Sequence, residues 1–156
     1  MTVFSQHPHA DHLVLHLSDT HFLGSGRQLY DQVDSDTPLR ALMERVVASE
    51  LPVEALIFTG DLADRAEADA YVRLRDLVEP WAQKLGAELV WVMGNHDERE
   101  PFSEIMWREE PTMDTRDRVI MLGDLRLIVL DSSVPGYHHG ELTAAQLSWL
   151  RAELAT

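Results

Sequence analysis

Short apolar runs at regular intervals organise the first hundred residues of the chain. Three runs rich in Val, Leu and Ile have the length of buried strands and span residues 13–18, 54–59 and 88–93. Continuous apolar runs of this kind are typical of strands that are covered on both faces of a parallel sheet. The pattern therefore predicts three strands of one buried sheet.

Helical periodicity fills the intervals between these runs. Apolar residues recur three or four positions apart over residues 38–50 and 67–85, which places them on one face of a helix. Gly86 supplies a stop for the second helix, whereas Pro80 should kink that helix or end it early. A shorter third helix is predicted over residues 101–110.

The hydrophobic pattern of the last third of the chain differs from that of the first two thirds. Residues 118–122 and 125–131 are predicted to form a hairpin around the two-residue turn Gly123-Asp124. Thr143 is placed to cap a final helix. The order β-α-β-α-β-α, followed by a hairpin and a helix, indicates an α/β fold with helices flanking the sheet.

Polar motifs follow each of the three predicted strands where the strand ends. They are Asp19-Thr20-His21, Gly60-Asp61 and Gly94-Asn95-His96-Asp97. Because the carboxyl ends of parallel strands meet at one edge of a sheet, we expect these motifs to come together. Carboxylate, amide and imidazole groups suit Mn, Fe or Zn better than Ca. The sequence therefore predicts a metal site at this edge.

Each motif alone has a simpler interpretation. Asp19 and His21 share a face of an extended chain, but an Asp two residues before a His is also common in surface turns. Gly-Asp after a strand is an ordinary turn, although the carboxylate of Asp61 could bridge two ions. Asn95 could cap the next helix instead of offering its amide oxygen, and His96 adds a titratable ring. The occurrence of all three motifs in this order favours the metal site.

Other polar residues near the motifs favour less specific interpretations. Asp64 and Arg65 are expected to start the next helix in solvent, with a supporting role for a metal ligand as the alternative. His138 and His139 belong to a predicted surface loop that could reach the same edge and contact substrate. The leader histidines, His12 among them, are expected to be solvated.

Composition narrows the class of protein. A chain of 156 residues, 45% hydrophobic, is long enough for at most one domain with a real core. Residues 1–12 are predicted to be a disordered leader that is neither a signal nor a transit peptide, and residues 13–156 to be a partial domain. The net charge of −14 argues against a DNA or RNA footprint. No run is long enough to span a bilayer, and the absence of Cys fits a cytoplasmic location.

The sequence around the three motifs resembles the calcineurin-like metallophosphoesterase superfamily. Within this superfamily, the sequence is similar to the class III cyclic nucleotide phosphodiesterases of bacteria. The stretches that carry this likeness are Leu17-Ser18-Asp19-Thr20-His21, Thr59-Gly60-Asp61-Leu62-Ala63-Asp64 and Val92-Met93-Gly94-Asn95-His96-Asp97. The stretches 130–136 and 140–142 extend the resemblance to the mycobacterial branch of that class.

The resemblance implies roles for particular residues. It implies that Asp19 and His21 bind a first metal ion, that Asp61 bridges, and that Asn95 binds a second ion. His96 would contact the phosphate or protonate the leaving oxygen, and His138 is a further candidate for substrate contact. The implied cofactors are two divalent or mixed-valence ions, Mn or Fe first and Zn as an alternative. The implied substrate is a 3′,5′-cyclic nucleotide or another small phosphodiester, and the implied assembly a homodimer.

The resemblance covers the N-terminal half of such a domain. Relatives continue through a His block and a Gly-His-x-His block that complete two metal shells, and neither block is found here. The expected fold is thus the N-terminal half of the metallophosphoesterase β-sandwich, and this chain alone is expected to be inactive. An inactive fragment or a metal-binding half-domain is one alternative function, and a phosphomonoesterase or nuclease of the same superfamily is another.

Overall fold

A three-stranded parallel sheet lies at the centre of the computed structural model, which describes residues 10–155. Its strands are β1 (Val14–Leu17), β2 (Ala55–Thr59) and β3 (Glu88–Val92), in the order β1-β2-β3. In this register Phe58 of β2 lies between Leu17 and Trp91 of the neighbouring strands. Because all three strands are parallel, the loops after them leave the sheet at the same edge.

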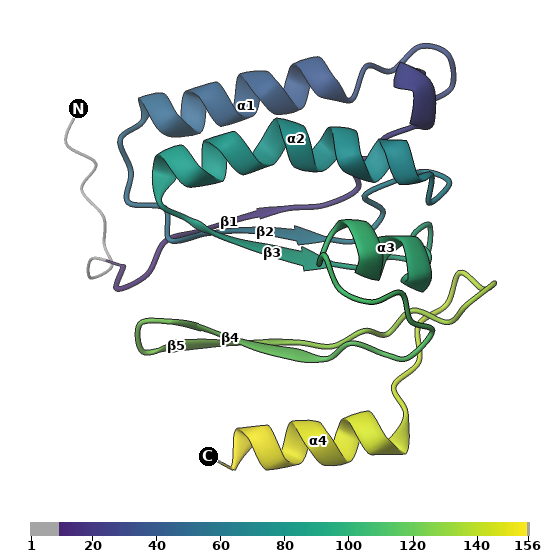
Figure 1. Ribbon diagram of the computed structural model, residues 1–156. Helices are drawn as coiled ribbons and strands as arrows, with labels where there is room; N and C mark the ends of the chain where they lie inside the picture. Colours follow the sequence, from purple (N-terminus) through teal and green to yellow (C-terminus); the bar gives the residue numbers. More distant parts are fainter. Residues whose placement is uncertain (1–9, 156) are drawn as a thin grey trace.

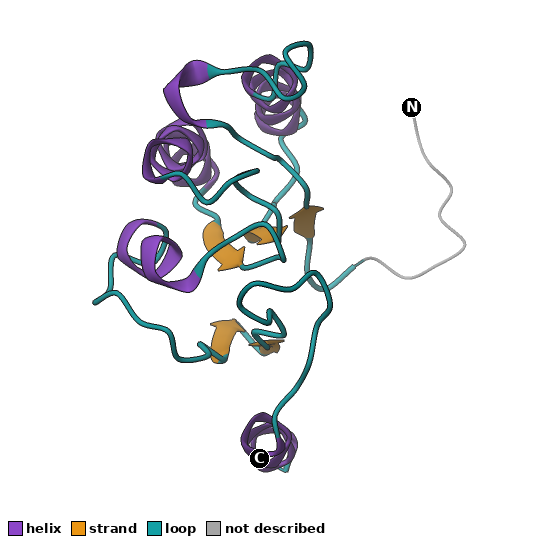
Figure 2. Cartoon of the chain, turned by 90° about the vertical axis from the view of Figure 1, so that its right-hand side faces the viewer, coloured by secondary structure: helices purple, strands orange, loops and turns teal. Residues whose placement is uncertain are grey.

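Two helices cover one face of this sheet, and a third lies beside the end of β3 (Figures 1 and 2). They are α1 (Asp36–Ala48), α2 (Ala68–Leu85) and α3 (Arg99–Ile105). The apolar stripe of α2, which includes Tyr71, Leu74 and Val78, is fully buried against the sheet. Phe102 of α3 packs edge-to-face on Tyr71, with 5.6 Å between the ring centroids. One continuous core therefore joins the helices to the strand ends.

A separate antiparallel hairpin lies across the opposite face of the sheet (Figures 1 and 2). It consists of β4 (Arg118–Leu122) and β5 (Leu125–Val129), and it forms a two-stranded sheet of its own. The last helix, α4 (Ala144–Leu154), lies beyond the hairpin, so the layers run helices, sheet, hairpin, helix. Thr143 caps α4 in a capping box with Gln146, as predicted.

The predicted α/β order is confirmed, and the early end that Pro80 could give the second helix is not found. Helix α2 does not end early at Pro80 but continues to Leu85 and stops at Gly86, which has φ of +68°. The carbonyl of Asp76, which loses its partner because proline has no N–H, lies on the exposed side of the helix where water can satisfy it. On α4 the fully buried residue is the polar Gln146, while Leu147 and Leu150 are half-buried.

The predicted leader is described only from residue 10 onward, and residues 1–9 lie outside the described residues. The expectation that His12 is solvated is wrong. Its Nδ1 lies 2.8 Å from a carboxylate oxygen of Glu54, before β2, and its Nε2 lies 2.8 Å from Asp124 in the hairpin turn. His12 thus connects the parallel sheet to the hairpin.

Candidate metal centre

The three sequence motifs meet at the carboxyl edge of the parallel sheet. Backbone pairing continues beyond the strands: the Asp19 N–H donates to the Gly60 carbonyl at 3.0 Å and the His21 N–H to the Asp61 carbonyl at 2.9 Å. On the other side the Gly60 N–H donates to the Val92 carbonyl at 2.9 Å. These bonds hold the loop after β2 between the loops after β1 and β3.

The carboxylate of Asp61 faces both neighbouring motifs. Its Oδ1 accepts a hydrogen bond of 3.0 Å from the His96 N–H. Its Oδ2 lies 3.9 Å from Nε2 of His21. The side chain is only 16% exposed, so it is fixed between the two motifs and does not extend into solvent.

Two glycines let the loops after β2 and β3 approach to backbone contact. A Cβ at Gly60 would lie 2.8 Å from the Cα of Gly94, and Gly60 has φ of +84°. A Cβ at Gly94 would lie 2.3 Å from Oδ1 of Asp61. A side chain at Gly60 would therefore push against the Gly94 backbone, and one at Gly94 would displace Asp61.

The backbone itself is strained at this edge. Asp19, His21 and Asp61 have φ of +57°, +42° and +51°, in the left-handed region that non-glycine residues rarely adopt. Each such residue costs on the order of 1–3 kcal/mol and persists only where its surroundings fix it. Asp19 and His21 are therefore not on extended chain as predicted, and the left-handed backbone directs the side chains of Asp19, His21 and Asp61 toward one point.

The donor set around His21 fits a divalent cation. Ligand atoms of Asp19, His21 and Asp61 all lie within 4.8 Å of one another. Nδ1 of His21 lies 3.2 Å from a carboxylate oxygen of Asp64. Because a carboxylate only accepts, the ring proton is assigned to Nδ1, which leaves the Nε2 lone pair facing Asp19 and Asp61. This arrangement of an imidazole held by an outer carboxylate is common around protein-bound metal ions.

Asp64 therefore occupies a different place from the one predicted. The expectation of a solvated residue at the start of a helix is wrong, because α2 begins at Ala68 and the Asp64 side chain is 17% exposed. Its side chain contacts His21, and its carbonyl accepts from Nδ1 of His96 at 2.9 Å. Arg65, in contrast, is exposed as expected. The alternative supporting role for Asp64 fits the structure.

His96 lies against His21, with ring centroids 4.9 Å apart and the rings nearly perpendicular. Ligand atoms of His21, Asp64 and His96 form a second group within 4.8 Å. The hydrogen bond to the Asp64 carbonyl raises the pKa of His96, the carboxylates of Asp61 and Asp64 add to this, and burial opposes it. Because the carbonyl fixes the proton of Nδ1, Nε2 is the nitrogen that remains for a ligand.

Asn95 and His138 meet on the open side of the centre. Asn95 is exposed, and its Nδ2 lies 2.9 Å from Nδ1 of His138. The His138 ring is 5.9 Å from that of His96, between centroids. The loop that carries His138 therefore reaches the same edge, whereas His139 pairs with Glu141 at 3.0 Å on the surface.

Asp97 supports the centre from beneath and was given no role by the sequence. It is 7% exposed, and its carboxylate accepts from the N–H groups of Leu62, Ala63 and Gly94 at 3.2, 3.2 and 2.8 Å. The Tyr71 hydroxyl donates a fourth bond of 2.9 Å. Burial raises the pKa of Asp97 although these bonds favour its charged form. Its partners are mainly backbone amides, which nearly every residue type has, so the sequence does not indicate these contacts.

Comparison with known proteins identifies the family. Residues 12–152 match the model of the calcineurin-like phosphoesterases, and the chain belongs to this family. The resemblance stated from the sequence is thereby confirmed. The family implies divalent metal ions, in agreement with the two groups of His and Asp ligands at the sheet edge.

Three relatives show where in the family the chain lies. It is 55% identical to a cAMP/cGMP dual specificity phosphodiesterase of Mycobacterium tuberculosis, over 97% of this chain and 48% of the relative. It is 48% identical to a probable cyclic nucleotide phosphodiesterase of Rhodococcus erythropolis, over 97% and 50%. It is 36% identical to a 3′,5′-cyclic adenosine monophosphate phosphodiesterase of Pseudomonas aeruginosa, over 89% and 48%. The chain spans about half the length of these curated relatives.

The helices in the described part of the chain are all too short or too polar to cross a membrane.

Proposed function

We propose that this chain carries the first half of a dinuclear metal centre that hydrolyses phosphodiesters, with 3′,5′-cyclic nucleotides as substrates. Support for the substrate class comes from relatives whose names specify cyclic nucleotides. Support for the centre comes from the donor atoms of Asp19, His21 and Asp61, which converge on one point.

The position of the Asp61 carboxylate carries the proposal. One oxygen faces the loop after β3 and the other faces His21, which is the arrangement that a bridging ligand requires. In this assignment Asp19 and His21 hold the first ion, and Asn95 contributes its amide oxygen to the second. When bound, two divalent ions supply Lewis-acid polarisation of the phosphoryl oxygens and activate a water molecule.

His96 is proposed to act on the substrate and not as a metal ligand. Its Nδ1 donates to the Asp64 carbonyl, so the ring is oriented with Nε2 toward the open side of the centre. From there Nε2 can bind a phosphoryl oxygen or transfer a proton to the leaving oxygen, a role typically worth about 10²–10⁴ in rate. His138, held by Asn95, is placed to contact the same substrate.

The number of ligands limits what this chain does alone. Asp19, His21, Asp61 and Asn95 fill only part of two metal shells, and affinity falls when ligands are missing. We therefore infer that the 156-residue chain binds Mn²⁺ but turns over cyclic nucleotides or aryl phosphodiesters negligibly. Robust hydrolysis by the pure chain that a chelator abolishes would contradict this inference.

Metal binding by single variants tests the site. Mn²⁺ content, measured by elemental analysis after gel filtration, should be lost in Asp61→Ala and largely kept in His96→Ala. His139→Ala is the matched control, because His139 is an exposed histidine whose contacts, to Glu141 and to the Tyr137 ring, lie outside the proposed ligand set. Equal metal loss in Asp61→Ala and His96→Ala would make His96 a ligand, and retention in Asp61→Ala would refute the bridge.

A further inference from the structure

A pocket opens beside His96, on the side away from His21. It has a volume of about 410 Å³ and lies between the start of α3 and the loop that carries His138. His96 and His138 are among the residues that line it. This volume is in the range of about 300–1,000 Å³ that small-molecule sites occupy. A group attached to an oxygen held at His96 would extend into this space.

Five apolar or aromatic side chains contribute to the walls of the pocket. Pro101 and Met113 lie on one side, and Val134, Pro135 and Tyr137 lie on the other. Tyr137 is 62% exposed and Met113 is 53% exposed, so both side chains are accessible to a ligand. A turn from Val134 to Tyr137, closed by a hydrogen bond of 2.9 Å, presents the tyrosine. An exposed aromatic ring beside a flexible thioether offers a surface on which a flat heterocycle can stack.

The charges of the pocket disfavour an anion. Glu98 and Glu100 lie at its rim, and Arg99 is the one Arg or Lys among the residues that line it in the described chain. All three guanidinium nitrogens of Arg99 donate within the protein, to Asp131, Ser133 and Met113. The pocket therefore suits a neutral group, and phosphate is left to the centre at the sheet edge.

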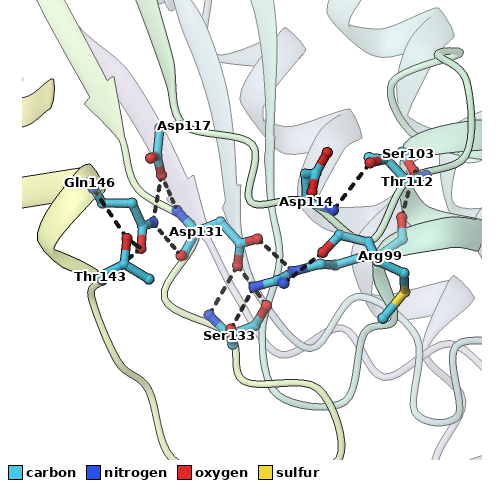
Figure 3. A network of polar contacts seen from close by, with 10 residues as sticks. Arg99, Ser103, Thr112, Asp114, Asp117, Asp131, Ser133, Thr143 and Gln146 are labelled. Atoms are coloured by element: carbon cyan, nitrogen blue, oxygen red, sulfur yellow. Dashed lines mark hydrogen bonds and ion pairs between the residues drawn. The ribbon is translucent and has the colours of Figure 1, made fainter.

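The two walls are held in place by one polar network (Figure 3). Arg99 donates to a carboxylate oxygen of Asp131 at 3.0 Å and to the carbonyls of Ser133 and Met113, both at 2.8 Å. Asp131 is 3% exposed, and its carbonyl accepts from Gln146 of α4 at 2.8 Å. Because Arg99 contacts both walls, their spacing is fixed before any ligand arrives.

We propose that this pocket binds the uncharged nucleoside of the substrate, with the base stacked on Tyr137 and against Met113. The proposal rests on the proposed function, since it places the phosphate of the same molecule beside His96. It adds a specificity: the pocket selects a heterocycle and rejects further phosphates.

Adenosine binding to the metal-free chain tests the proposal without hydrolysis. Adenosine should bind saturably in the presence of EDTA, with amide NMR shifts concentrated at residues 99–101, 113 and 133–138. Tyr137→Ala should weaken binding about tenfold, within the range for loss of one base–aromatic stack. Tyr30→Ala, at an 80% exposed tyrosine that does not line this pocket, should leave binding unchanged.

A second pair of variants and two anions complete the test. Met113→Ala should weaken adenosine binding, and Met121→Ala, at a methionine of similar exposure on β4, should not. Inorganic phosphate and ribose 5-phosphate should not displace adenosine. Absence of saturable adenosine binding, equal effects of Tyr137→Ala and Tyr30→Ala, or displacement by phosphate would overturn the proposal. Failure of the proposed function would appear separately, as absence of Mn²⁺ binding that depends on Asp61.

Discussion

At the scale of single residues, Asp64 links the two histidines of the centre. Its side chain orients His21 and its carbonyl orients His96, so one residue fixes the tautomers of both rings. Substitution of Asp64 removes the contact of its side chain with His21 but keeps the contact of its carbonyl with His96. This difference allows the role of the Asp64 side chain to be measured on its own.

Asp64→Ala should lower Mn²⁺ affinity about 10- to 100-fold, as is typical when the outer partner of a metal-binding histidine is lost. The His96 contact survives because it uses the backbone. Isothermal titration with Mn²⁺ measures the effect. Asp76→Ala, at an exposed acidic residue of α2, removes the same charge away from the centre and should leave affinity within twofold, about the effect of losing one distant surface charge. Equal affinity in Asp64→Ala and the unmodified chain would show that His21 needs no outer partner.

At the scale of elements, Arg99 joins α3 to the loop after β5, and Gln146 extends the connection to α4. The Arg99 side chain is 12% exposed and that of Asp131 only 3%. Removing one partner of a buried ion pair leaves the other uncompensated, which costs about 3–5 kcal/mol. Loss of one partner of the Arg99–Asp131 pair should therefore lower the free energy of unfolding more than loss of one partner of a surface ion pair.

Arg99→Ala should destabilise the fold by about 3 kcal/mol in urea unfolding at neutral pH. Arg108→Ala is the matched control, since Arg108 is 63% exposed in its pair with Glu79 and its loss should cost about 0–1 kcal/mol. Similar midpoints for the two variants would mean that the buried pair contributes no more than a surface pair.

The sequence predicts the elements better than the contacts between them. The three strands, the hairpin and the cap at Thr143 follow from local periodicity and turn chemistry, and the structure contains them all. One reason explains why the sequence analysis misjudged Asp64 and His12 and gave no role to Asp97. Their partners lie 26 to 112 residues away or are backbone amides, so no local pattern indicates them.

At the scale of the whole molecule, His12 is one of the polar links between the parallel sheet and the hairpin. The hydrogen bond to Glu54 raises the pKa of His12, and that to Asp124 adds to it. The same contacts lower the pKa of Glu54 and of Asp124. The charged form of this cluster is therefore favoured in the folded state.

The direction of the pH dependence follows from these shifts. A histidine whose pKa is raised on folding stabilises fully below its ordinary value of 6.5, and this contribution is lost as pH rises through the raised value. The carboxylates, whose pKa values are lowered on folding, add to the stability of the fold only above about pH 4, where they are charged. The cluster thus stabilises the fold most between these limits.

The urea midpoint should fall between about pH 6 and about pH 8.5, and His12→Gln should reduce that fall. His96, whose pKa is also raised, acts in the same direction, so the comparison between the variant and the unmodified chain is the measurement. His139→Gln should leave the fall unchanged. An identical pH dependence in His12→Gln would exclude His12 as a stabilising link.

The contact between Asp61 and the His96 amide has a consequence for how the chain reaches its native state. The two residues are 35 positions apart, and the Asp64–His21 contact spans 43, so the centre is complete only after all three strands have paired. A slip of one residue between β2 and β3 would turn the Asp61 side chain to the other face. A bound ion stabilises only the correctly paired chain, by mass action. In the proposed centre, metal binding would thereby select the strand register during folding.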